Sequence, residues 1–413
     1  MKQSMKSCEF VDEAAVRAIL AQKQVSTFFQ PVVSIPAKSV IGFETFSRPA
    51  GESCSLDPRA LFHEDLEPDL MIKMDMLCRG MALKRFKPFH DDHDGLLLFL
   101  KVNPEVFRHL EVARSALPRQ LEEAGITPER VVIEFPPRLP YADRVLQFVA
   151  LYRDLGVRIG LDGCSATDAY TNAVNRVGPE FAKVDRTFFG EGERQDHSSR
   201  CLETLLAVVD RAGGKVIGQG VESEEESIRL LSAGVHLQQG YYYTKDENAV
   251  SGEQAARLME KIDRVNRKYK GVKKEFVRRK KEGFVETFRS VNSACSKLEN
   301  LCEDEFEAGC KALLARRPEV LSVFILNADG VQVTGRIHTN ARSPRSDTLL
   351  GTWKGTDHSA QDYVLYLEMG YQKFVTKPFV SAYGGQTACL ITKPFYDHLG
   401  DRYTFCLEMP YPG

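Results

Sequence analysis

Residues 131–162, VVIEFPPRLPYADRVLQFVALYRDLGVRIGLD, decide the fold that the sequence predicts. Two short apolar runs, VVIEF (131–135) and VRIGLD (157–162), flank a segment long enough to form a helix. Continuously apolar runs of this length are typical of strands that are covered on both faces, as in a parallel sheet. The stretch therefore predicts a strand–helix–strand unit whose two strands carry acidic residues near their ends.

The same alternation extends from residue 25 to about residue 245 and favours a β/α barrel. Only the short segment PAKS joins the first two runs, which leaves no room for a crossover helix, so we expect these two strands to be antiparallel. The predicted fold class is α/β, a modified TIM-type (β/α)8 barrel with an antiparallel first strand pair. The eight strand-like runs cover residues 25–35, 40–46, 96–103, 131–135, 157–162, 181–185, 215–221 and 237–243.

We expect residues 8–250 to form the barrel. The residues that follow have a different pattern of apolar and polar side chains. In residues 251–316, apolar side chains recur at spacings of three and four, which predicts a long linker helix with a coiled-coil-like seam. A seam of this kind has to be buried, so we expect a homodimer held through this helix. Residues 317–413 consist of strand-like runs and glycine-containing turns. They predict a small antiparallel sheet domain of the α+β class.

Composition narrows the class of protein. The 413 residues exceed what one hydrophobic core usually serves. A net charge of −2 gives no general attraction to nucleic acid or membranes, and we interpret the basic stretch 257–281 as a solvated helix face rather than a nucleic-acid patch. No apolar run approaches the ~20 residues that span a bilayer. The ten cysteines show no paired spacing, so we expect reduced thiols in a cytoplasmic protein.

Polar side chains stand where the predicted strands end, which is where β/α barrels carry their functional sites. Buried singly, each would cost several kcal/mol, on the order of 2–7. Convergence on a hard cation would satisfy carboxylates and amides together. A polar barrel interior that binds no ligand is the alternative. The residues are Glu44, Asn103, Glu134, Asp162, Lys183, Asp185, Glu222 and Gln239.

In order and spacing, the motifs of residues 20–245 resemble the EAL family of cyclic di-GMP phosphodiesterases. The resemblance implies hydrolysis of cyclic di-GMP to linear pGpG by two divalent cations and an activated water. It assigns Glu44, Asn103, Glu134 and Asp162 to one metal site, which would hold Mg²⁺ or Ca²⁺. The matching segments are FFQPVVSI (28–35), GFETFSR (42–48), LKVNPEVF (100–107), VVIEFPPR (131–138), AKVD (182–185) and QQGYYY (238–243).

Departures from the family pattern affect the second metal site. Gly163 stands where a second aspartate follows Asp162, and Gln219 replaces a glutamate. Two carboxylates are thereby missing, which leaves one divalent ion poorly compensated. We therefore expect no intact catalytic centre. Lys183, Gln219 and Gly163 occupy positions that belong to the catalytic centre in the family.

The resemblance also implies a nucleotide site that could persist without catalysis. Arg48 can hold a phosphate through its planar guanidinium group, and Gln30 and Gln239 can address guanine edges. Phe46 is bulkier than the leucine of the family motif. The implied nucleotide-binding residues are Gln30, Glu44, Phe46, Arg48, Asp185, Glu222, Gln239 and Tyr241.

The order of barrel, long helix and small sheet domain resembles a YkuI-type arrangement with a PAS- or Cache-like C-terminal domain. Three functions are compatible with these residues. The favoured one is a non-catalytic bacterial cyclic di-GMP receptor that is coupled to a sensor domain. The alternatives are an active phosphodiesterase and a protein-interaction scaffold that binds no nucleotide.

Overall fold

The computed structural model describes residues 13–51, 61–63, 65–137, 142–164, 169–189, 195–244, 252–338, 353–383 and 385–411. The chain divides into two compact units, Met1–Gly271 and Val272–Gly413. The division falls inside a helix, α8 (Gly252–Leu298), so this helix contributes residues to both units.

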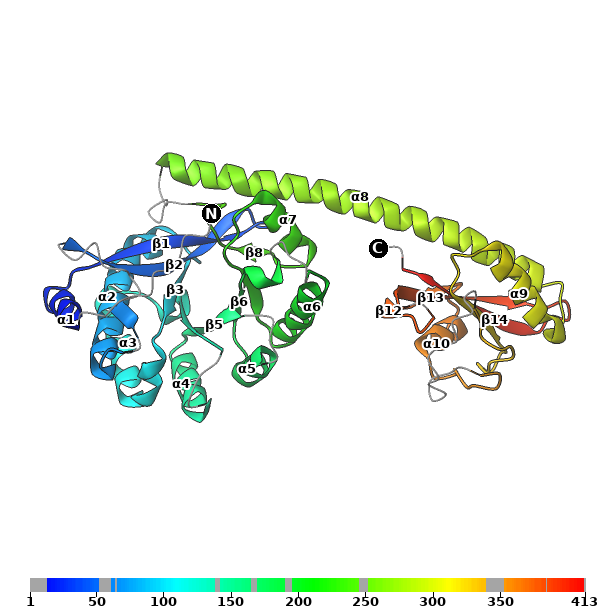
Figure 1. Cartoon of the computed structure of the whole chain (residues 1–413), viewed down its shortest axis with the longest axis horizontal. Helices are drawn as coiled ribbons and strands as arrows, with labels where there is room; N and C mark the ends of the chain where they lie inside the picture. The colour runs from blue at the N-terminus through cyan, green and yellow to red at the C-terminus, as the bar shows by residue number, and fades with distance from the viewer. Residues whose placement is uncertain are drawn as a thin grey trace. The chain divides into compact units, whose positions relative to one another are not determined.

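The first unit is a closed eight-stranded barrel, which confirms the predicted fold class (Figure 1). As expected, β1 (Val25–Ser34) and β2 (Ser39–Pro49) are antiparallel. The pairs from β2 to β8 are parallel, and β8 closes the barrel on β1. The other strands are β3 (Leu97–Lys101), β4 (Val131–Phe135), β5 (Arg158–Cys164), β6 (Phe181–Val184), β7 (Lys215–Gly218) and β8 (Leu237–Gln238).

Helices surround the barrel and bury the outward-facing apolar side chains of its strands (Figure 1). On β3, for example, Leu98 and Leu100 pack in this outer core, whereas Leu97 and Phe99 belong to a separate cluster of buried apolar side chains from several strands. The alternation follows from the strand period of two. The helices are α1 (Glu13–Gln22), α2 (Pro68–Asp92), α3 (Leu110–Ala124), α4 (Ala142–Asp154), α5 (Ala169–Val177), α6 (Gln195–Arg211) and α7 (Glu224–Ser232).

Helix α8 ends at Leu298, before residue 316, which corrects the prediction of one helix over 251–316. A short 3-10 turn, η6 (Glu303–Glu305), leads into a separate helix, α9 (Phe306–Arg316). Two segments, rather than one, therefore carry the apolar periodicity.

The two ends of the seam of α8 are buried within the chain itself. Leu258, Ile262 and Val265 pack in the core of the barrel unit. Asn266 Nδ2 donates to the Ile35 carbonyl over 2.9 Å, which fixes the helix on the loop after β1. The last seam residues, from Val291 to Leu298, pack in the core of the second unit. Between these two ends, Val272 and Phe276 of the predicted seam are 46% and 40% exposed, so the homodimer remains a prediction.

The second unit contains the sheet domain that the sequence predicts. Its antiparallel sheet has the order β10-β9-β14-β13-β11, with β12 pairing to β13. The end of α8 and α9 cover one face, and α10 (Asp362–Glu368) packs in a second cluster with residues of β9, β13 and β14. The strands are β9 (Ser322–Leu326), β10 (Ile337–His338), β11 (Phe374–Val375), β12 (Phe379–Val380), β13 (Thr387–Tyr396) and β14 (Arg402–Pro410).

Two expectations from composition can be compared with the described part of the chain. None of its helices has the length and apolar character needed to cross a membrane. Seven cysteines whose side chains are described are free thiols, and five of these seven are buried.

We expect Ile262→Ala to lower the free energy of unfolding by about 2–5 kcal/mol, because it leaves a cavity in a well-packed core. Met259→Ala is the matched control, since Met259 lies on the same helix with 37% of its surface exposed and its loss should cost less than about 0.5 kcal/mol. Urea unfolding followed by circular dichroism measures both. A loss for Ile262→Ala that varies with protein concentration would show that a second chain covers the seam.

Candidate functional site

Strand register brings the polar side chains together at the carboxyl ends of β2 to β6. Glu44 on β2 lies opposite Gln30 on β1 and Phe99 on β3. Lys101 is two residues beyond Phe99 and lies opposite Glu134 on β4. Because side chains two apart share a face of the strand, Lys101 faces the barrel interior with Phe99.

A buried lysine on β6 connects two carboxylates. Lys183 Nζ lies 2.9 Å from Glu44 Oε2 and 2.8 Å from both carboxylate oxygens of Glu134. The side chains of Lys183 and Glu134 are fully buried. Gly160 on β5 leaves room for Glu134, since a Cβ atom there would come within 3.0 Å of the Glu134 Cγ. This ionic contact joins β2, β4 and β6.

A second lysine, which the sequence analysis did not single out, lies between two of the expected metal ligands. Lys101 Nζ is 2.8 Å from Glu44 Oε1 and 3.1 Å from Asp162 Oδ2. It also lies 5.4 Å from the centre of the Phe46 ring, within reach of a cation–π interaction. The Lys101 side chain is 47% exposed, so it forms the outer edge of the cluster.

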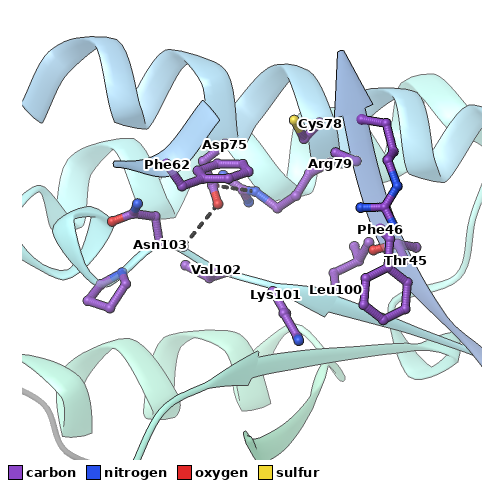
Figure 2. A pocket seen from close by; sticks show the side chains of 13 residues that line it. Thr45, Phe46, Phe62, Asp75, Cys78, Arg79, Leu100, Lys101, Val102 and Asn103 are labelled. Atoms are coloured by element: carbon purple, nitrogen blue, oxygen red, sulfur yellow. Dashed lines mark hydrogen bonds and ion pairs between the residues drawn. The ribbon is translucent and has the colours of Figure 1, made fainter. Parts of the chain in front are cut away.

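Asn103, which was predicted as a metal ligand, lies beyond the end of β3, and its side chain caps a helix. Its Oδ1 accepts a hydrogen bond from the Glu105 N–H at 2.9 Å and caps the 3-10 helix η3 (Pro104–Arg108). Figure 2 shows the Asn103 and Lys101 side chains pointing in different directions on either side of Val102. The sequence contains the signal: an asparagine followed by proline is a typical helix start, and β3 has already ended at Lys101.

Opposing influences set the protonation of the two buried glutamates. Burial would raise the pKa of Glu44, but the charges of Lys183 and Lys101 outweigh it and hold this pKa at about 2. Burial dominates at Glu134, where Glu44 and Asp162 add to it, and the pKa rises to about 8 despite Lys183. Glu134 is therefore the carboxyl group most ready to keep a proton.

The two lysines remain cations. Burial would lower the pKa of each, but the surrounding carboxylates reverse this effect and raise the pKa of both Lys101 and Lys183. Two positive charges thus face three carboxyl groups, of which Glu134 has a raised pKa. The cluster is close to electrically balanced by its own side chains.

Because of this balance, few oxygen ligands and little uncompensated negative charge are left for a divalent cation. Both oxygens of Glu44 and both oxygens of Glu134 already lie within ion-pair distance of an ammonium group. Asp162 Oδ1 is buried with no hydrogen-bond partner among the described residues. Mg²⁺ and Ca²⁺ require six or more oxygen ligands. Across the described ranges, no group of three or more His, Cys, Asp or Glu side chains is arranged to hold a metal ion. The residues present therefore do not fit a divalent ion here.

All eight predicted nucleotide-binding residues line one cavity of about 520 Å³ at the barrel mouth. Gln239 Nε2 donates to Gln30 Oε1 over 2.7 Å and also bonds Glu44, whereas the buried Gln239 Oε1 has no described partner. Six lining residues were not predicted to bind the nucleotide: Lys101, Arg186, Thr187, Gln219, Gly220 and Gly240. The complete lining is Gln30, Glu44, Phe46, Arg48, Lys101, Asp185, Arg186, Thr187, Gln219, Gly220, Glu222, Gln239, Gly240 and Tyr241.

Two of the acidic lining residues already have partners. Asp185 caps the 3-10 helix η5 (Arg186–Phe188) by accepting a hydrogen bond from the Thr187 N–H at 2.9 Å. Glu222 pairs with Arg186 at 2.7 Å. The N-terminus of α7 holds Glu222 in place, because Glu226 accepts a hydrogen bond from its N–H at 2.7 Å. These contacts shape the cavity wall and reduce its negative charge.

A second cavity of about 540 Å³ adjoins the first and is shown in Figure 2. Phe46, Arg48 and Lys101 line both cavities and form a shared ridge. A buried ion pair on α2, Arg79 Nε to Asp75 Oδ2 at 2.8 Å, lines the second cavity. Asp75 Oδ1 also accepts a hydrogen bond from the Asn103 N–H, which ties α2 to the end of β3.

The two positions that depart from the family pattern differ in setting. Gly163 is exposed, and a Cβ atom there would meet nothing within 4 Å. Its φ of +72°, however, is one that side-chain-bearing residues rarely adopt, so an aspartate would strain the backbone. Gln219 lines the first cavity with its neutral amide.

Comparison with known proteins places these features in a family. A model of the EAL domain matches residues 12–246. The cyclic di-GMP phosphodiesterase RocR of Pseudomonas aeruginosa is 22% identical over 227 residues, which cover 54% of this chain and 57% of RocR. The probable cyclic di-GMP phosphodiesterase PdeN of Escherichia coli is 22% identical over 238 residues, 56% of this chain and 45% of PdeN. The chain thus spans about half the length of these relatives.

A solved structure resembles the chain along almost its whole length. It is the Bacillus subtilis YkuI protein, which has an EAL domain, in complex with the substrate cyclic di-GMP and calcium. The TM-score is 0.79 at 16% sequence identity, and the match covers 97% of this chain and 100% of that chain. At this identity the likeness shows a common fold.

We expect Lys183→Met to destabilise the protein by about 3–5 kcal/mol, because it leaves Glu44 and Glu134 buried without their shared counter-charge. The loss should increase as pH rises, because Glu134 then lacks a counter-charge and Glu44 keeps only Lys101. Both buried carboxyl groups are tolerated when they are neutral at low pH and are penalised when they are ionised at high pH. Denaturant unfolding at pH 5 and pH 8 measures the difference.

Lys215→Met is the control, because Lys215 is an exposed lysine at the start of β7. Its unfolding free energy should change by less than about 0.5 kcal/mol at either pH. Equal stabilities of Lys183→Met and the unmodified chain at pH 8 would contradict the buried cluster.

Proposed function

Because the chain belongs to the EAL domain family, we propose that it acts in bacterial cyclic di-GMP signalling as a receptor that binds the nucleotide without hydrolysing it. The observation that carries this proposal is the pair of cavities that meet at Phe46, Arg48 and Lys101.

The shape of the site suits a cyclic dinucleotide. Such a ligand has two bases joined by a ring with two phosphates, and the two cavities, about 540 and 520 Å³, are each of ordinary ligand-site size. One base would enter each cavity, and the phosphate ring would cross the ridge. Arg48, which is half-buried on that ridge, would bond a phosphate through its guanidinium group.

The polar groups suit a guanine edge. Gln239 Oε1 is a buried acceptor without a described partner, and guanine presents N–H donors on its Watson–Crick edge. The hydrogen bond from Gln239 to Gln30 holds this amide in place. Tyr241 is 53% exposed at the cavity rim and offers a ring on which a base could stack.

The proposed absence of hydrolysis rests on the carboxylates that are missing. A two-metal phosphodiesterase needs anionic ligands for both ions. Gly163 and Gln219 remove two of them, and Lys183 is occupied as the counter-ion of Glu44 and Glu134. We therefore assign Lys183 a structural role at the barrel mouth.

The proposal includes the second unit and the assembly. Residues 317–413 would form a PAS- or Cache-like sensor domain that regulates the barrel; the likeness in fold to the YkuI protein includes this part of the chain. We propose that the protein is a cytoplasmic homodimer that acts on an unidentified protein partner. Val272 and Phe276 on α8 are 46% and 40% exposed and are the residues of the predicted seam that remain available to a second chain.

We expect isothermal titration to show binding of cyclic di-GMP to the full chain, with one ligand per chain. Arg48→Ala should weaken binding about 10- to 150-fold, which corresponds to losing a charged hydrogen bond of about 1.5–3 kcal/mol. Arg119→Ala is the control, because Arg119 is a 66% exposed arginine on α3.

The same samples decide between the three functions when they are incubated for a day and the nucleotides are separated by chromatography. Intact cyclic di-GMP with measurable binding supports the receptor. Formation of pGpG would establish an active phosphodiesterase instead. No binding at 100-fold excess of ligand would favour the scaffold.

A further inference from the structure

We propose that the Lys101 ammonium group takes the place of a divalent cation between Glu44 and Asp162, so that this barrel binds its ligand independently of divalent metal. The metal-independent binding of the ligand rests on the proposed function, whereas the position of the Lys101 ammonium group does not. It replaces the single Mg²⁺ or Ca²⁺ that the sequence predicted.

The first argument is position. Lys101 Nζ lies 2.8 Å from Glu44 Oε1 and 3.1 Å from Asp162 Oδ2, so one positive charge bridges two carboxylates from different strands. These two residues were expected to share a metal ion. The ammonium group is therefore located where the bridging cation was predicted.

The second argument is charge. Glu44 is also paired with Lys183, and Glu134 directs both oxygens to Lys183. A divalent ion at this site would have to displace Lys101 from Glu44 and Asp162 or lie beside its positive charge. Either arrangement is unfavourable, because like charges repel strongly at such distances in a partly buried site.

The third argument is the neighbouring ring. Phe46 places its ring centre 5.4 Å from Lys101 Nζ, and an aromatic face attracts an ammonium group. Phe46 and Lys101 line both cavities, and Figure 2 shows them in the second cavity. Lys101 can thus present its charge to a phosphate on the ridge while it remains anchored to the carboxylates.

The test is metal binding by the full chain, measured with Mn²⁺ by electron paramagnetic resonance. We expect no bound Mn²⁺ at 1 mM with the unmodified chain. Lys101→Asn removes the charge and supplies an amide oxygen, so it should bind about one Mn²⁺ per chain. Lys73→Asn is the matched control, because Lys73 is an exposed lysine on α2, and it should bind none.

Lys101→Gln repeats the test with a longer amide side chain, and thermal melts establish that each variant is folded. The proposal is overturned if the unmodified chain binds one Mn²⁺ per chain. It is equally overturned if both amide variants are folded and bind none. Neither result depends on any nucleotide.

The second readout is nucleotide affinity with EDTA or with 5 mM MgCl₂. The unmodified chain should bind cyclic di-GMP with less than a twofold difference between the two conditions. Lys101→Asn should bind at least tenfold more tightly with Mg²⁺. Metal-dependent binding by the unmodified chain would refute the inference. If no protein binds the nucleotide at all, the proposed function fails, and the Mn²⁺ measurement still decides the role of Lys101.

Discussion

The barrel mouth depends on the compensation of one buried positive charge. Lys183 is fully buried, and an ammonium group in such a place is stable only if its charge is paired and its hydrogen bonds are made. Glu44 and Glu134 provide both conditions, and their positions then fix their neighbours. Gln239 bonds Glu44, Gln30 bonds Gln239, and Lys101 reaches the other oxygen of Glu44. The walls of the nucleotide-sized cavity are thus organised around this single ion cluster.

Sequence reasoning recovered the barrel because strand length and apolar content are local properties. The short connection between β1 and β2 was enough to predict their antiparallel pairing, since a crossover needs more residues. The family motifs also identified residues that line one cavity, from Gln30 to Tyr241. Glu44, Glu134 and Asp162 lie at the carboxyl ends of β2, β4 and β5, where Lys101 and Lys183 connect them.

Two features of the structure were not foreseen from the sequence, each for a physical reason. Asn103 was chosen because its amide is a plausible ligand, but the strand ends at Lys101 and the next polar side chain turns to cap η3. Counting in steps of two from Phe99 would have identified Lys101 as the residue that faces inward. The seam of α8 was assigned to a partner helix because periodicity reports an apolar face without reporting what covers it. Ile262 and Cys295 are covered by the two cores of the same chain.

The origin of the ionic cluster in alternate strands has a consequence for how the barrel folds. Glu44, Lys183 and Glu134 belong to β2, β6 and β4, so no two of them are neighbours in the sheet. A partly assembled barrel that lacks β6 leaves Glu134 without its counter-charge, and one that lacks β2 or β4 removes one of the two carboxylates that surround Lys183. The cluster therefore disfavours half-formed barrels and makes closure cooperative, with the last strand to dock completing both the hydrogen-bonded ring and its charge balance.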